Sequence, residues 1–138
     1  MLLYVMRHGP AEDTAPSGRD RDRRLTVAGR SVVERAAREL SASRTAPLGR
    51  ILTSPLVRAR ETAEIVWRIA GDAAHPIRPD DALAADAATP IELLLDVARA
   101  GADALLVGHN PNVEDLVREV VRGPMLVPGF RTATILAL

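Results

Sequence analysis

Short apolar runs alternate with longer amphipathic stretches along this chain, and this alternation constrains its fold more than any other feature. The run LLYVM and the start of the run ALLVGH are continuously apolar, which is typical of strands buried on both faces of a sheet. Three weaker runs have the same strand-like character. The five predicted strands cover 2–6, 50–54, 75–79, 104–109 and 132–138.

The stretches between these runs predict helices. In the first of them, Val33, Ala36, Ala37 and Leu40 recur at the spacing of one helix face, and Thr26 stands where an N-cap is expected. Strands that alternate with helices form βαβ units, whose parallel sheet is covered on both faces. We therefore expect an α/β fold with a mostly parallel central sheet of about five strands. The predicted helices cover 25–43, 54–71, 90–101 and 111–123.

Composition narrows the classes of function. A length of 138 residues fits one domain, 1–138, and 47% of the residues are hydrophobic, which is enough for one core. The absence of cysteine excludes disulfides and thiolate metal sites. A formal net charge of zero argues against a nucleic-acid partner. The chain has no apolar run of membrane-spanning length and opens without a basic leader region, so we expect a cytoplasmic protein with no membrane partner.

Polar residues capable of chemistry gather where the predicted strands end. The first strand leads into Arg7, His8 and Gly9, and the fourth ends at His109. Arg58 lies four residues beyond the end of the second strand. Ligands bind outside the carboxyl ends of parallel strands, so these side chains are expected to share one site.

The chemistry that suits these groups is phosphoryl transfer. Arginine matches phosphate oxygens in pairs, and two arginines with a protonated histidine would neutralise a phosphate monoester. Arg58 and His109 also precede or begin helices, where an anion is favoured. A neutral His8 could attack phosphorus directly, and Gly9 would allow a tight turn beside it. No metal or other cofactor is needed for this scheme.

Three motifs in order, MRHGPAE, SPLVRARETA and VGHNP, resemble the histidine phosphatase superfamily, also called the phosphoglycerate mutase-like family. The stretch RDRRLTVAG further resembles the SixA-type phosphohistidine phosphatases, in which it reads like R-x-L-T-x-x-G. The resemblance covers nearly the whole chain. It implies a three-layer αβα sandwich with a phosphoglycerate mutase-like sheet.

The resemblance also implies roles for individual residues. His8 matches the nucleophile of the family, Arg7 and Arg58 match its phosphate-binding arginines, and His109 matches the second histidine that contacts the phosphate. A phosphorylated protein, such as a histidine-containing phosphotransfer domain, or a small phosphorylated metabolite would be the substrate.

One family feature has no clear counterpart here. Many members place a carboxylic general acid in the loop before the third major helix, where this chain reads PDDALAADAATP. Asp80, Asp81 and Asp86 are candidates, of which Asp81 and Asp86 are preferred, but none fits the family pattern. An imidazole leaving group departs more easily than a sugar alkoxide and needs an acid less. The missing acid therefore favours protein phosphohistidine over sugar or nucleotide phosphates, which remain the alternative substrates. A non-catalytic phosphate-binding module is a second alternative.

Several residues keep two interpretations. Ser54 is expected to cap the second helix, although it could contact the phosphate, as could Gly9. Arg60 could replace Arg58 in the pocket. Arg23 or Arg24 could touch a substrate, although their charged run is typical of a solvated loop.

Overall fold

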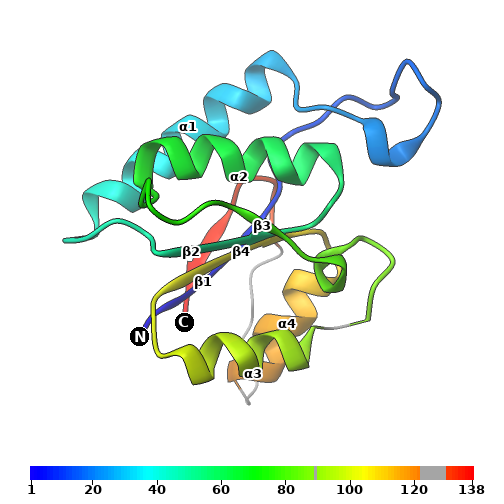
Figure 1. Cartoon of the computed structure of the whole chain (residues 1–138). Coiled ribbons are helices and arrows are strands. Elements are labelled where there is room, and N and C mark those ends of the chain that lie inside the picture. The colour runs from blue at the N-terminus through cyan, green and yellow to red at the C-terminus, as the bar shows by residue number, and fades with distance from the viewer. Residues whose placement is uncertain (89, 122–129) are drawn as a thin grey trace.

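Five strands form one mixed sheet at the centre of the molecule. In the computed structural model, which describes residues 1–88, 90–121 and 130–138, the strand order is β3-β2-β4-β1-β5 (Figure 1). The pairs β1–β4, β4–β2 and β2–β3 are parallel, and β5 alone runs antiparallel, along β1. The prediction of a mostly parallel five-stranded sheet is confirmed. The strands are β1 (Leu3–Arg7), β2 (Arg50–Thr53), β3 (Arg78–Pro79), β4 (Ala104–Gly108) and β5 (Ile135–Ala137).

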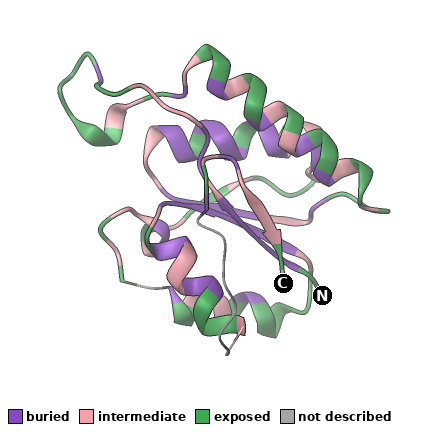
Figure 2. Cartoon of the chain, turned by 180° about the vertical axis from the view of Figure 1, so that it is seen from behind, coloured by how far each residue is buried: buried purple, intermediate pink, exposed green. Residues whose placement is uncertain are grey.

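Two helices cover each face of the sheet and complete three layers (Figure 1). Alternate residues of each strand point to opposite faces, so Met6 and Val107 pack with α1 and α2 while Val5 and Leu106 pack with α3 and α4. In Figure 2 the buried surface lies on the strands and on the sheet-facing sides of the helices. The helices are α1 (Val27–Ala42), α2 (Val57–Ala70), α3 (Ile91–Ala100) and α4 (Asn112–Val121). Among the described residues, no helix has the length and apolar character needed to cross a bilayer.

The helix boundaries test the capping predictions. Thr26 caps α1 as expected, and its Oγ1 accepts a hydrogen bond from the Gly29 N–H at 2.8 Å. Ser54 does not cap α2, which begins at Val57 after Leu56. Ser54 instead continues β2, because its N–H donates to the Val107 carbonyl at 2.9 Å. Because Ser54 is still held beside β4, the chain turns at Pro55 and Leu56 and the helix starts later than predicted.

Two other segments differ from the prediction. The strand expected at 75–79 shrinks to Arg78–Pro79, because the His75 N–H bonds to the Asp72 carbonyl in a turn and Pro76 has no N–H for a ladder. The loop after β1 is not fully irregular, since it contains a short 3₁₀ helix, η1 (Asp20–Asp22), and an isolated bridge from Ala11 to Leu25. The last two residues predicted for the fourth helix lie outside the described residues.

Candidate active site

The carboxyl ends of three adjacent strands bring the site together. His8 follows β1, His109 follows β4 and Ser54 follows β2, and main-chain bonds lock these ends in register. The His8 N–H donates to the Gly108 carbonyl at 3.0 Å. The ring centroids of His8 and His109 lie 5.0 Å apart. Arg58, in the first turn of α2, completes the group from the neighbouring layer.

His8 has one defined tautomer and an electron pair available at Nε2. Its Nδ1 lies 2.7 Å from the Gly9 carbonyl, which can only accept, so Nδ1 carries the proton. Burial, and to a smaller extent the charges of Arg58, Arg7 and Arg23, lower the pKa of His8 to about 4 against the opposing Gly9 bond. The ring is therefore neutral at pH 7. A neutral imidazole with a fixed tautomer can act as a nucleophile through Nε2.

His109 is also neutral. Burial, followed by the coulombic effects of His8 and Arg58, lowers its pKa to about 3. A protonated histidine beside the arginines, as the sequence suggested for a bound phosphate, would therefore need the charge of the phosphate to offset this burial and nearby positive charge. Its Nε2 lies 2.7 Å from Ser54 Oγ, and that hydroxyl also accepts from the Leu56 N–H at 3.2 Å. If the Ser54 hydroxyl donates to Nε2, Nδ1 carries the proton of His109.

Arg7 lies at the end of β1 and Arg58 in α2, so the two arginines approach the histidines from the sheet and from a helix layer. The Arg7 Nη1 donates to the Phe130 carbonyl at 2.9 Å, whereas its Nε is buried and has no hydrogen-bond partner among the described residues. His109 Nδ1 is likewise buried and has no hydrogen-bond partner in the described part of the chain. Arg58 is 5% exposed, and its Nε donates to His8 Nε2 at 3.3 Å. Arg60, the alternative to Arg58, is exposed on the other side of α2.

Gly9 lies against α1 and α2. Its N–H donates to Thr62 Oγ1 at 3.0 Å, and that hydroxyl donates to the Arg58 carbonyl at 2.7 Å. A Cβ at this position would overlap Val33 Cγ2. Close packing therefore requires glycine here, rather than a left-handed turn, since Gly9 is not among the glycines with positive φ.

The loop after β1 contributes contacts that the sequence did not reveal. Both terminal nitrogens of Arg58 bond to Asp20: Nη1 to its carbonyl at 2.9 Å and Nη2 to Oδ2 at 3.1 Å. Arg23 Nη1 bonds to the other oxygen of the same carboxylate at 2.8 Å. Glu61, which is 7% exposed, anchors the end of the loop by accepting from the Leu25 N–H at 2.8 Å and from two further arginines, Arg24 and Arg30.

The candidate acids lie beside these groups. Asp81 and Asp86 line a cavity of about 700 Å³ that Asp20, Pro55 and Leu56 also line. Within the described part of the chain, no hydrogen bond joins either candidate to the histidines or arginines of the site. Among the same residues, no cluster of three His, Cys, Asp or Glu side chains is arranged to hold a metal ion.

Comparison with known proteins places this geometry in context. The family model of the histidine phosphatase superfamily (branch 1) matches residues 3–85. An uncharacterized protein of Picosynechococcus is 37% identical over 130 residues, which cover 89% of this chain and 74% of that protein.

Two solved structures carry the likeness across the whole fold. A protein of Agrobacterium tumefaciens assigned as the phosphohistidine phosphatase SixA superposes with a TM-score of 0.83 at 30% identity, covering 99% of this chain and 90% of its own. The protein histidine phosphatase SixA complexed with tungstate gives a TM-score of 0.87 at 27% identity, with 99% and 86% covered.

Proposed function

Because this chain belongs to the histidine phosphatase superfamily (branch 1) and is a phosphatase of that family, we propose that it hydrolyses phosphohistidine on a protein through a phospho-His8 intermediate. The observation that carries this proposal is the state of His8. Its proton is held at Nδ1 by the Gly9 carbonyl, its ring is neutral, and its Nε2 lies among cationic donors.

The proposed reaction has two displacements at phosphorus. The Nε2 lone pair of His8 attacks, the P–N bond of the substrate breaks, and the departing imidazole takes up one proton from solvent water at the nitrogen that it frees. Water then attacks phospho-His8, the second P–N bond breaks and inorganic phosphate leaves. The attacking water gives up one proton to solvent, and His8 returns to its neutral form; its proton stays on Nδ1, hydrogen-bonded to the Gly9 carbonyl, throughout.

The remaining polar groups stabilise the charge of the transferring phosphoryl group. Arg7 Nε and, in the tautomer described above, His109 Nδ1–H are buried donors without a partner among residues 1–88, 90–121 and 130–138, so phosphoryl oxygens are their natural acceptors. Arg58 supplies a second guanidinium. An arriving dianion raises the pKa of His109 and so strengthens its hydrogen bond. Gly9 and Ser54 act indirectly, since Gly9 fixes the tautomer of His8 and Ser54 holds His109.

The leaving group decides between substrates. A sugar or nucleotide alkoxide requires a proton from a well-placed acid. Among the described carboxylates, Asp20 alone bonds to Arg58, and it is held there as an ion pair with Arg58 and Arg23. Both similar SixA structures are named as histidine phosphatases, which supports the same preference. A small-molecule phosphomonoesterase is the second candidate, because Asp81 and Asp86 line the adjoining cavity.

Turnover of a phosphohistidine peptide beside a panel of sugar and nucleotide phosphates, with EDTA present, tests the proposal. The wild type should prefer the phosphohistidine peptide and accumulate acid-labile phosphate on the protein in rapid-quench samples. His8→Ala should lose both, whereas His75→Ala should behave as wild type, because that exposed histidine makes its hydrogen bonds, among the described residues, to Asp72 and Trp67.

Two outcomes would redirect the assignment. Acid-labile phosphate on His8→Ala would show that another residue is the nucleophile. A preference for alkyl phosphates that falls with Asp81→Asn or Asp86→Asn would establish the second candidate instead.

A further inference from the structure

We propose that the Asp20 carboxylate occupies, in the ligand-free enzyme, the place of a phosphoryl group, and that substrate phosphate displaces it and binds both Arg58 and Arg23. This inference rests on the proposed function. It adds Arg23 as a third phosphate-binding arginine and makes Asp20 an internal competitor of the substrate.

The contacts of Asp20 are those of a bound oxyanion. One carboxylate oxygen accepts from Arg58 Nη2 at 3.1 Å, and the other accepts from Arg23 Nη1 at 2.8 Å. The Asp20 carbonyl accepts from Arg58 Nη1 at 2.9 Å. One planar anion thus bridges two guanidinium groups, as a phosphate would with its oxygens. The third donor of Arg58, Nε, meanwhile points at His8 Nε2, the atom that must face phosphorus.

Asp20 and a phosphoryl group would compete for Arg58. Three of the five N–H donors of Arg58 are bonded, two to Asp20 and one to His8 Nε2. A phosphoryl group at His8 Nε2 displaces the Nε bond to His8, and paired contacts with the guanidinium require the side of it that Asp20 holds. A dianion also repels a carboxylate held at the same two arginines, so exchange is favoured over joint binding.

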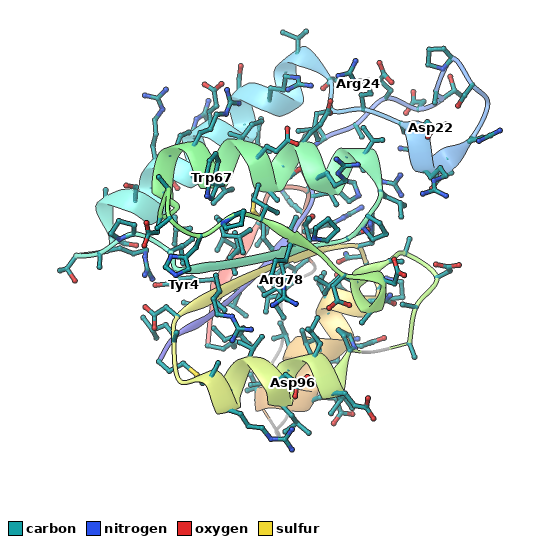
Figure 3. All side chains as sticks on the ribbon, in the orientation of Figure 1. Tyr4, Asp22, Arg24, Trp67, Arg78 and Asp96 are labelled. Carbon is teal, nitrogen blue, oxygen red and sulfur yellow. The ribbon has the colours of Figure 1, made fainter. Side chains whose placement is uncertain are left out.

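Asp20 is placed to leave at low cost. Its side chain is 61% exposed, whereas that of Arg58 is 6% exposed, so the carboxylate moves into water while the guanidinium stays. The loop on which Asp20 lies is tied at its two ends, by the Ala11–Leu25 bridge and by Glu61. Figure 3 shows this loop, with Asp22 and Arg24 labelled, beside the first turn of α2. Movement of η1 would leave these anchors in place.

Arg23 lies close enough to act on the transferring group. Its Nε is fixed to the Glu12 carbonyl at 2.5 Å, which aims its other donors at Asp20. Its charge is among those that lower the pKa of His8. Once Asp20 leaves, these donors face the same space as those of Arg58.

Calorimetric titration with inorganic phosphate tests the exchange without depending on turnover. Asp20→Asn should bind phosphate roughly three- to tenfold more tightly than wild type, because the competing anion is gone. The matched control is Asp22→Asn, which removes the same charge from the same 3₁₀ turn; the Asp22 carboxylate bonds to Ser17, and its removal should change affinity less than about twofold.

Arg23 is tested in the background where Asp20 no longer competes. The double variant Asp20→Asn/Arg23→Ala should bind phosphate roughly fivefold or more weakly than Asp20→Asn alone. In a tungstate-bound crystal structure, Asp20 should lie outside hydrogen-bond distance of Arg58.

Unchanged or weaker phosphate binding by Asp20→Asn would overturn the inference, as would a tungstate complex that retains the Asp20–Arg58 contact. If the wild type turns over phosphohistidine while Asp20→Asn shows no gain, only this inference fails. If the wild type neither binds phosphate nor forms a phosphoenzyme, the proposed function fails with it.

Discussion

Replacing Arg58 with alanine should remove the largest part of the charge stabilisation at His8. The guanidinium is 5% exposed and already contacts His8 Nε2 at 3.3 Å, so it adjoins the phosphorus position from within the protein. At an effective dielectric constant of about 20, two unit charges about 4 Å apart interact by about 4 kcal/mol. Loss of a single oxyanion donor in other enzymes costs about 2.7–4 kcal/mol. We expect about 2–4 kcal/mol for Arg58→Ala, or roughly 30- to 1,000-fold in kcat/KM.

The assay is single-turnover formation of phosphoenzyme, followed by steady-state hydrolysis of a phosphohistidine peptide. Arg60→Ala is the matched control, because it removes an equal charge from an exposed position of the same helix. Arg58→Lys should fall between the wild type and Arg58→Ala, since lysine keeps the charge and loses the planar fork. Arg58→Ala kinetics within threefold of wild type would refute this reasoning, and an equal loss in Arg60→Ala would assign the effect to net surface charge.

Three further predictions concern packing, anchoring and pH. Gly9→Ala should destabilise the fold by about 1–3 kcal/mol in chemical unfolding, because the new methyl group overlaps α1, while Gly49→Ala, with open space around it, should cost less than about 1 kcal/mol. Glu61→Gln should lower stability by about 1–3 kcal/mol and speed proteolysis of the loop after β1, whereas Glu64→Gln, on the exposed side of α2, should do neither. The two active-site histidines have folded pKa values of about 4 and about 3, below the unfolded value of 6.5, so the unfolded chain binds more protons. The free energy of unfolding should therefore fall as pH drops from about 6.5 toward 4, by at most about 1.4 kcal/mol per pH unit for each histidine. Urea titrations at several pH values would measure this fall. A free energy of unfolding that does not change over this pH range would contradict the assigned pKa values.

The sequence predicted the convergence of the site because parallel strands impose it. His8 and His109 follow strands whose apolar runs are unmistakable, and adjacent parallel strands end at the same edge. The helix that presents Arg58 is equally clear, since its apolar face repeats over four turns. Placement of these residues required only local patterns and one rule of sheet topology.

Contacts set by the tertiary structure were not predictable in this way. The charged run around Asp20 and Arg23 is typical of a solvated loop, and only its path across α2 brings Asp20 to Arg58. Nothing in the sequence distinguishes Glu61 from its exposed neighbour Glu64. In the fold, Glu61 accepts hydrogen bonds from Arg24, Leu25 and Arg30, which are distant from it along the chain. The lowered pKa of His109 likewise follows from burial and nearby charges that only the tertiary structure sets.

The position of β1 in the sheet also governs when the site can exist during synthesis. Residues 3–85 contain three of the four central site residues, yet both strands that flank β1 come later in the chain. β4 must insert between β1 and β2, and β5 must pair along the other side of β1, before the His8 strand has neighbours. A nascent chain that has exposed its His8 motif therefore has no organised phosphatase centre. Contacts between residues distant in sequence form late, so the site can be organised only after β4 and β5 have emerged from the ribosome.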